Sequence, residues 1–278
     1  MSKIKVIKFF SSFCDSSKCK EVYEKICQVI PNNRFSITTD NDYNFAVIIN
    51  TAMPKLNISK ENVIGLAFEP VQFLGLTNEF IQYAVQHISK YYIGDTTAFN
   101  LPKPFIEHYA YMWHPIPLKS IPVKPKILSI VISEKLSAPG HKYRHHLTQE
   151  MLKRKLPVDI YGRGCNLYNK KNISNIMGEF NGLEPYEKYV FHIAIENFQT
   201  EAYFSEKITS PLLCGTIPIY LGCKTIEKYF PNEVIRLSGV IDKDVLLIED
   251  LIKNPEKYKK NIDVESIRNT IHLFNHIV

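Results

Sequence analysis

Short runs of β-branched and aromatic residues alternate along this chain with longer stretches in which apolar residues recur at helical spacing. This alternation is typical of an α/β protein with parallel sheets. Eight runs are predicted to be strands: Ile4–Phe9, Phe45–Asn50, Val63–Phe68, Ile88–Ile93, Lys126–Ser133, Val158–Tyr161, Val190–Ile195 and Thr216–Leu221. Six stretches are predicted to be helices: Glu21–Val29, Asn78–Val85, His145–Arg154, Ser205–Leu213, Asp244–Ile252 and Val264–Ile277.

The pattern breaks at residues 114–125, where four prolines occur within a dozen residues. Proline cannot continue a helix or a central strand, so we interpret this segment as a linker. It would separate an N-terminal domain (1–117) from a C-terminal domain (126–278), with the linker at 118–125. The alternative is an irregular loop inside one domain. Two α/β domains facing each other would form a cleft for a ligand at the carboxyl ends of their strands.

Composition argues for a folded protein and against a nucleic-acid binder. Of the 278 residues, 45% are hydrophobic and 22% charged, which is enough to build a core. The net charge of +6 comes from 28 Lys and only 6 Arg, with no dense basic run. Arg is the usual choice for recognising phosphates and bases, so we expect no nucleic-acid partner. A basic protein with an anionic small substrate explains the charge equally well.

The cysteines and the apolar stretches bear on location. The six cysteines include no C-x-x-C pair and no Cys/His cluster at zinc spacing, so we expect free thiols. No stretch approaches the ~18–20 apolar residues of a membrane span, and the first ten residues are too short an apolar run for a signal peptide. The prediction is therefore a cytoplasmic protein without a membrane span. The oligomeric state is not indicated.

The most informative segment is Tyr189–Gly222, YVFHIAIENFQTEAYFSEKITSPLLCGTIPIYLG. A buried strand ends in Glu196–Asn197, and a polar loop leads into a helix that begins near Tyr203–Ser205 and carries Glu206 and Lys207. Backbone N–H groups and the helix dipole attract phosphate there, and carboxylates accept sugar hydroxyls. The alternative is an ordinary βαβ unit in which Ser205 caps the helix and the charged side chains face water.

This segment resembles the signature of the α-1,3/4-fucosyltransferases, glycosyltransferase family 10. That signature has the form F-x-L-x-F-E-N-S-x-x-x-D-Y-V-T-E-K, followed by a helix and a V-P-V-x-x-G strand. The matching positions are Glu196, Asn197, Tyr203, Glu206, Lys207, Pro218 and Gly222. The chain departs from the signature at Phe198, where Ser is usual, and at Ala202, where Asp is usual.

Two other stretches are similar to the same family. In residues 125–162, Ser133 and Arg144 fall on a Ser and on an Arg that opens a helix, while Glu134 replaces an Asn. An Arg there can clamp a pyrophosphate with its planar fork; the alternative is a surface Arg on a helix. Residues 67–70, Ala-Phe-Glu-Pro, resemble a segment whose carboxylate acts as general base, which places that role on Glu69; the alternative is a loop Glu before a Pro.

The resemblance implies an α/β fold of the GT-B type, two Rossmann-like domains facing a central cleft. The first domain would bind the glycan acceptor and the second the nucleotide sugar, and the last helix would pack back on the first domain. The implied reaction transfers fucose, or a related deoxysugar, from a GDP-sugar to an acceptor hydroxyl with inversion. Its implied donor-binding residues are Ser133, Arg144, Glu196, Asn197, Tyr203, Ser205, Glu206 and Lys207.

Two alternatives to this function stay open from the sequence. One is a transferase that uses another nucleotide sugar, linked to UDP or dTDP, and the other is a non-catalytic relative that binds carbohydrate or nucleotide.

Metal binding has only weak candidates. Asp40-Asn41-Asp42 and Asp242-Lys243-Asp244 have the D-x-D form that can hold a hard cation with phosphates. Asp244 precedes an apolar helix and reads as an N-cap, and the other motif reads as a polar turn. With Arg144 and Lys207 on the diphosphate, we expect a metal-independent reaction without a cofactor.

Overall fold

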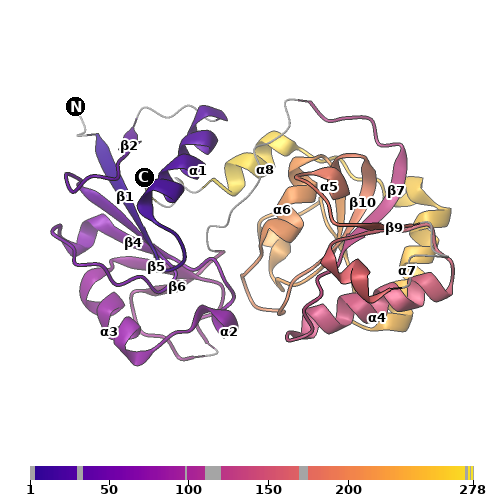
Figure 1. Ribbon diagram of the computed structural model, residues 1–278, viewed down its shortest axis with the longest axis horizontal. Helices are drawn as coiled ribbons and strands as arrows, with labels where there is room; N and C mark the ends of the chain where they lie inside the picture. The colour runs from indigo at the N-terminus through magenta and orange to yellow at the C-terminus, as the bar shows by residue number, and fades with distance from the viewer. Residues whose placement is uncertain are drawn as a thin grey trace. The chain divides into compact units, whose positions relative to one another are not determined.

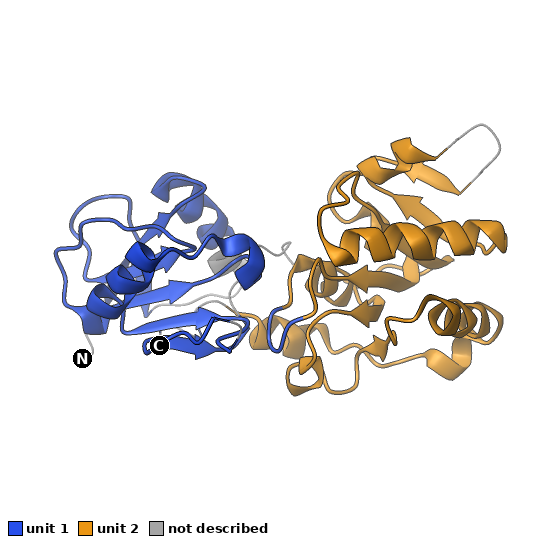
Figure 2. Cartoon of the chain, turned by 90° about the horizontal axis from the view of Figure 1, so that it is seen from below, with its two compact units in different colours: residues 1–116, 200–203, 273–278 blue, residues 117–199, 204–272 orange. Residues whose placement is uncertain are grey.

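The computed structural model describes residues 4–29, 34–97, 99–109, 120–168, 175–272, 275 and 277. It divides into two compact units, which Figure 2 colours separately. Unit 1 contains Met1–Ile116, Thr200–Tyr203 and Leu273–Val278; unit 2 contains Pro117–Gln199 and Phe204–His272. Part of the predicted linker, residues 118 and 119, lies outside the described residues.

Unit 1 is built on a six-stranded parallel sheet with strand order β2-β1-β3-β4-β5-β6 (Figure 1). The strands are β1 (Lys5–Ser11), β2 (Phe35–Ile37), β3 (Phe45–Ile49), β4 (Val63–Leu66), β5 (Lys90–Ile93) and β6 (Phe105–Glu107). All five residues of β3 are buried, as expected for a central strand covered on both faces.

Helices cover both faces of that sheet. Helix α1 (Ser16–Val29) packs Cys19 and Tyr23 against Ile7 and Phe9 of β1. On the opposite face, α3 (Asn78–His87) and the short α2 (Val71–Leu74) join a second apolar cluster, to which α3 contributes Phe80. Thr77 caps α3 by accepting a hydrogen bond from the backbone N–H of Phe80 at 3.1 Å. A 3-10 turn (Lys60–Asn62) precedes β4.

Unit 2 repeats this architecture with strand order β12-β11-β10-β7-β8-β9, again parallel throughout. Its strands are β7 (Lys126–Val131), β8 (Asp159–Tyr161), β9 (Ile176–Gly178), β10 (Tyr189–Ile195), β11 (Ile217–Leu221) and β12 (Ile235–Arg236). The chain runs outward from β7 through β8 and β9, and then returns to β10 on the other side of β7.

Two layers of helices enclose this second sheet. Helices α4 (Pro139–Lys153) and α7 (Ile241–Lys253) pack one face through Leu147, Met151, Val245 and Ile248. The short α5 (Glu184–Glu187) and α6 (Glu206–Leu213) contact β10 from the other face, and α8 (Val264–Thr270) contacts α6. Within the described residues of unit 2, 3-10 turns lie at Arg163–Leu167, Ile226–Lys228 and Pro255–Tyr258.

All eight predicted strands are present, but β2, β6, β9 and β12 were missed. These four are the edge strands of the two sheets, and each has only two or three residues, too few to show a pattern.

The predicted bounds of several helices were wrong. Helix α4 begins at Pro139 rather than His145, so Arg144 lies in its second turn, and α8 ends at Thr270 rather than Ile277. Helix α1 begins five residues before the predicted Glu21. Short polar starts such as the Ser-rich beginning of α1 carry no apolar periodicity.

The N-cap prediction for Asp244 was also wrong. Helix α7 begins at Ile241, and Asp244 is its fourth residue. Its buried carboxylate accepts hydrogen bonds from the backbone N–H groups of Ser238 (2.7 Å) and Gly239 (2.9 Å). It therefore fastens the loop before the helix to the first helical turn.

Within the described part of the chain, no helix combines the length and apolar character needed to cross a membrane. The cytoplasmic location stays a prediction.

Candidate functional site

The predicted donor residues of unit 2 gather at the carboxyl edge of its sheet. Ser133 follows β7, and Glu196 and Asn197 follow β10. These two strands are neighbours from which the chain continues in opposite directions, so this edge is the topological switch point. In open α/β sheets ligands bind in the crevice at such a point. The N-termini of α4 and α6 lie next to the same strands in sequence.

Glu196 is the buried centre of this group, with 2% of its surface exposed. Its Oε1 accepts hydrogen bonds from the backbone N–H of Ser205 (2.8 Å) and from Ser205 Oγ (3.0 Å), and its Oε2 lies 2.7 Å from the same Oγ. The carboxylate therefore sits at the N-terminus of α6, where the helix dipole stabilises an anion. Burial raises the pKa of Glu196, opposed by the nearby Lys207 ammonium.

Lys207 joins the two carboxylates of the motif. Its Nζ lies 3.0 Å from Glu206 Oε1, 3.7 Å from Glu196 Oε2 and 3.1 Å from Ser205 Oγ. Burial lowers the pKa of Lys207, but Glu206 and Glu196 outweigh it, so the pKa is raised. Burial raises the pKa of Glu206, and Lys207 outweighs it in the other direction, so that pKa is lowered. Both groups are therefore charged at neutral pH.

Arg144 is the second cation, and it is 95% buried, with 5% of its surface exposed. Its Nε donates to the carbonyl of Gly140 (3.2 Å) and its Nη2 to Asn197 Oδ1 (2.5 Å). Burial lowers the pKa of Arg144, against the effect of Glu196 and Glu206, but an Arg guanidinium keeps its proton in proteins. Among the described residues, none is recorded as accepting a hydrogen bond from Nη1.

Helix α4 and the loop after β10 are in direct backbone contact. The N–H of Gly140 donates to the carbonyl of Asn197 at 3.0 Å. A Cβ added to Gly140 would lie 1.8 Å from the carbonyl oxygen of Glu196. Only glycine allows this approach, which holds the loop against the helix that carries Arg144. Gly222 is under a similar constraint, since its added Cβ would lie 2.4 Å from Glu196 Cγ.

Two histidines of α4 complete the surroundings. His145 Nε2 lies 2.7 Å from the carbonyl oxygen of Ser133, which can only accept, so Nε2 carries a proton. His141 is buried, and burial together with Arg144, Lys135 and Lys207 lowers its pKa to about 4. His141 is thus neutral at pH 7, so the positive charge of this group comes from Arg144 and Lys207.

Tyr203 and Glu69 both belong to unit 1. The hydroxyl of Tyr203 donates to the carbonyl of Phe68 at 2.9 Å, and the N–H of Ala202 donates to the carbonyl of Gly94 at 2.8 Å. Tyr203 is therefore fixed to the residue that precedes Glu69. Glu69 itself is exposed, beyond the carboxyl end of β4.

Among the residues that the structure describes, no three His, Cys, Asp or Glu side chains are grouped as metal ligands. The unit 2 group brings together two cations that can meet an anion: Arg144, held by Gly140 and Asn197, and Lys207, which forms ion pairs with Glu196 and Glu206.

Comparison with known proteins identifies the family of this chain. Residues 121–260, just over half of the chain, match the family model "Glycosyltransferase family 10 (fucosyltransferase) C-term". This chain belongs to glycosyltransferase family 10. Alpha-(1,3)-fucosyltransferase B of Drosophila melanogaster is 33% identical over 120 residues, which are 41% of this chain and 24% of that protein. The chain spans about a quarter of the length of the curated relatives it matches.

Solved structures show the fold of this family 10 chain to be of the GT-B type. An α1,3-fucosyltransferase crystallised with GDP superposes with a TM-score of 0.56 at 16% identity, covering 100% of this chain and 92% of that one. An α-glucosyltransferase in complex with UDP and DNA superposes with a TM-score of 0.57 at 10% identity, covering 98% and 96%. At such identities the likeness concerns the fold and does not select a nucleotide.

Some features of the candidate site were missed by sequence reasoning. His141 and Gly140 were overlooked because the start of α4 was placed too late, although a Gly just after Pro139 is a signal of a close backbone contact. Glu179 and Phe180 follow β9, an edge strand without a sequence signal, and they line a hollow of about 300 Å³ together with Ser133 and Arg144.

Proposed function

We propose that this chain transfers fucose, or a related deoxysugar, from a GDP-sugar to a hydroxyl of a glycan acceptor, with inversion at the anomeric carbon. The observation that carries the proposal is the arrangement of Arg144 and Lys207 at the carboxyl edge of the unit 2 sheet. Membership of family 10 supports the reaction class.

In the proposed reaction the acceptor oxygen bonds to the anomeric carbon as the bond from that carbon to the diphosphate breaks. Negative charge then grows on the leaving GDP, and fixed positive groups stabilise it. We assign this role to Arg144 through its Nη1 and to Lys207 through its ammonium. The charge needs no metal in this proposal, and transfer in the presence of EDTA tests that point.

The remaining predicted residues take supporting roles in the proposal. Glu196 and Ser205 position Lys207. Both carboxylate oxygens of Glu196 accept hydrogen bonds from Ser205, and Lys207 Nζ contacts both residues. Glu206, half exposed, would accept ribose hydroxyls. Asn197 holds Arg144, Ser133 lines the hollow beside it, and Tyr203 fixes the loop to Phe68.

Glu69 is proposed as the general base that takes the proton of the acceptor hydroxyl. A carboxylate suits this role in transfer through an oxocarbenium-like state. Its support is its position after the buried strand β4 and the resemblance of residues 67–70 to the family segment.

The test is a melting-temperature series with GDP, UDP, dTDP and their sugars, with and without EDTA. At a ligand concentration of 100 times Kd, stabilisation of about 2.7 kcal/mol is expected for a true donor nucleotide. Lys207→Ala should lose the response to GDP, while Lys260→Ala, a change of an exposed lysine away from the site, should keep it. Stabilisation by UDP or dTDP but not by GDP would show that the donor is a UDP- or dTDP-sugar instead of a GDP-sugar. No response to any nucleotide would favour a non-catalytic relative.

Transfer from GDP-fucose to a panel of glycans that differ in their terminal sugar tests Glu69. Glu69→Gln should keep GDP binding and lose at least a hundredfold in kcat, since a general base contributes about 10²–10⁴. Near-normal turnover by this variant would remove the assignment.

A further inference from the structure

A hollow of about 300 Å³ lies at the carboxyl ends of β7, β8 and β9 in unit 2. Its lining residues are Val131, Ile132, Ser133, Arg144, Gly162, Arg163, Glu179 and Phe180. The volume is at the lower end of small-molecule sites, which fits one part of a nucleotide sugar rather than the whole.

Two glycines beside the hollow allow backbone segments to approach each other closely. Gly162 has φ +99, and a Cβ there would lie 2.3 Å from the carbonyl oxygen of Ile132. A Cβ on Gly164 would lie 2.8 Å from the carbonyl oxygen of Ser133. The turn after β8 is therefore in close contact with the end of β7, and Glu179 and Phe180, which follow β9, also line the hollow.

The hollow is lined by an aromatic ring and by charged side chains of both signs. The ring of Phe180 meets Tyr161 edge-to-face at 6.1 Å between centroids, which fixes an aromatic wall. Glu179 is exposed, and no described residue forms a hydrogen bond or ion pair with its carboxylate. Arg163, 62% exposed, has one loose ion pair with Glu134 at 3.6 Å. Arg144, the proposed diphosphate ligand, closes one side.

We infer that this hollow receives the base of the donor nucleotide and that Glu179 selects guanine. The inference rests on the proposed function, because it places the base beside the diphosphate held by Arg144. A carboxylate only accepts hydrogen bonds, and its two oxygens match the adjacent N1–H and N2–H donors of guanine. Arg163 is suited to the O6 and N7 acceptors of the same base. The ring of Phe180 supplies a stacking surface.

Other bases present a poorer match to this wall. Uracil and thymine offer a single N–H between two carbonyl oxygens, and those oxygens would repel a carboxylate. Adenine presents an acceptor nitrogen beside its amino group, so one carboxylate oxygen would face a lone pair. Hypoxanthine has the N1–H of guanine without the amino group, so inosine diphosphate isolates the contribution of N2–H.

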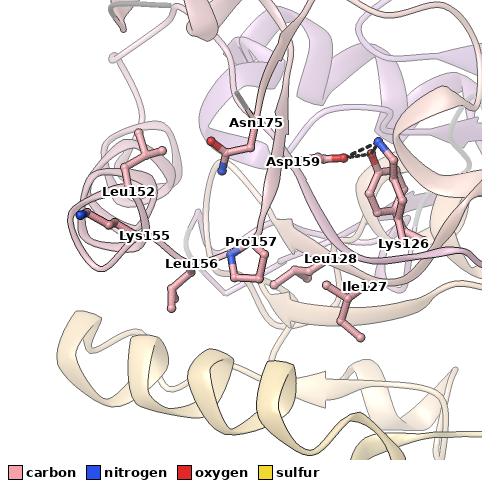
Figure 3. A pocket seen from close by; sticks show the side chains of 10 residues that line it. Lys126, Ile127, Leu128, Leu152, Lys155, Leu156, Pro157, Asp159 and Asn175 are labelled. Carbon is pink, nitrogen blue, oxygen red and sulfur yellow. Dashed lines mark hydrogen bonds and ion pairs between the residues drawn. The ribbon is translucent and has the colours of Figure 1, made fainter. Parts of the chain in front are cut away.

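A second hollow, of about 740 Å³, is not suited to this role (Figure 3). It is lined by the first residues of β7, β8 and β10, and so it lies at the amino edge of the sheet, away from Arg144. Its carboxylate, Asp159, is already engaged by Lys126 Nζ and by the hydroxyl of Tyr189, each at 2.6 Å. Both of these contacts are to Oδ2, so this carboxylate does not offer the two free oxygens that the adjacent N1–H and N2–H donors of guanine require.

The experiment is calorimetric titration of GDP, IDP, ADP and UDP into the full chain and into Glu179→Gln. Glu256→Gln, a change of an exposed glutamate in the 3-10 turn Pro255–Tyr258, is the matched control. The wild type should bind GDP at least tenfold more tightly than IDP and more tightly still than ADP and UDP. Glu179→Gln should lose about ten- to a hundredfold of the GDP affinity, as one bidentate base contact is worth, and lose the preference over IDP.

The outcomes separate this inference from the proposed function. GDP binding that survives in Glu179→Gln but is lost in Lys207→Ala would place the base elsewhere and overturn the inference alone. A wild type that binds none of the four nucleotides would overturn the proposed function and the inference with it. Unchanged melting temperatures of Glu179→Gln without nucleotide are expected, because the side chain has no partner among the described residues.

Discussion

Replacing Gly140 with Ala tests the contact that joins α4 to the loop after β10. Glycine in a helix is ordinarily about 1 kcal/mol less favourable than alanine, so helix propensity alone predicts that Gly140→Ala stabilises the protein. In this structure the new Cβ would lie 1.8 Å from the carbonyl oxygen of Glu196. Carbon and carbonyl oxygen normally stay about 3.3 Å apart, so helix and loop would have to separate by about 1.5 Å.

The expected cost follows from that displacement. Overpacking costs about 1–3 kcal/mol, and the hydrogen bond from Gly140 N–H to Asn197 would be lost, at about 1 kcal/mol. Subtracting the gain in helix propensity, about 1 kcal/mol, leaves a net destabilisation of about 1–3 kcal/mol. GDP binding should weaken as well, because Arg144 is held by the Gly140 carbonyl and by Asn197.

Urea unfolding followed by far-UV circular dichroism measures the effect, with Gly182→Ala as the control. Gly182 lies in the same unit at φ +54, and a Cβ there would meet nothing within 4 Å. Its substitution costs only backbone strain, about 1–2 kcal/mol, and should leave GDP binding unchanged. A Gly140→Ala protein as stable as the wild type, or more stable, would refute the steric argument.

Two further predictions concern buried groups of unit 2. At pH 8, Glu196→Gln should lower the free energy of unfolding by about 2–3 kcal/mol, because the hydrogen bonds that Ser205 donates to a buried charge are weakened. Its effect should be less than additive with that of Ser205→Ala, and full additivity would contradict the coupling of the two residues. Burial lowers the pKa of His192 to about 3 in the folded protein. Between pH 6.5 and 5 this histidine therefore gains a proton in the unfolded chain but stays neutral in the folded chain. The free energy of unfolding should fall by about 1.5 kcal/mol over that window. His192→Gln should remove this part of the slope in urea midpoints measured at half-unit steps, and parallel curves for the two proteins would show that His192 does not titrate as argued.

The central architecture could be read from the residues. The central strands β3, β4, β10 and β11 are buried on both faces at all or nearly all of their residues, so they appear as nearly continuous apolar runs, which is typical of parallel sheets covered on both faces. The motif residues Glu196, Ser205 and Lys207 also needed only the sequence, because a strand end and a helix start nine residues apart bring them together locally.

Contacts between distant segments were decided by the tertiary structure alone. The four edge strands exist because a neighbouring strand offers hydrogen bonds, and two or three residues contain no signal of that partner. The same reason hides Glu179, which reaches the hollow beside Arg144 only because β9 pairs with β8. Likewise, the contact of Gly140 with Glu196 joins residues 56 positions apart, and only the packing of α4 against the end of β10 brings their backbones together. Local sequence determines which segments are buried, whereas the close approach of two backbones depends on how the whole sheet is ordered.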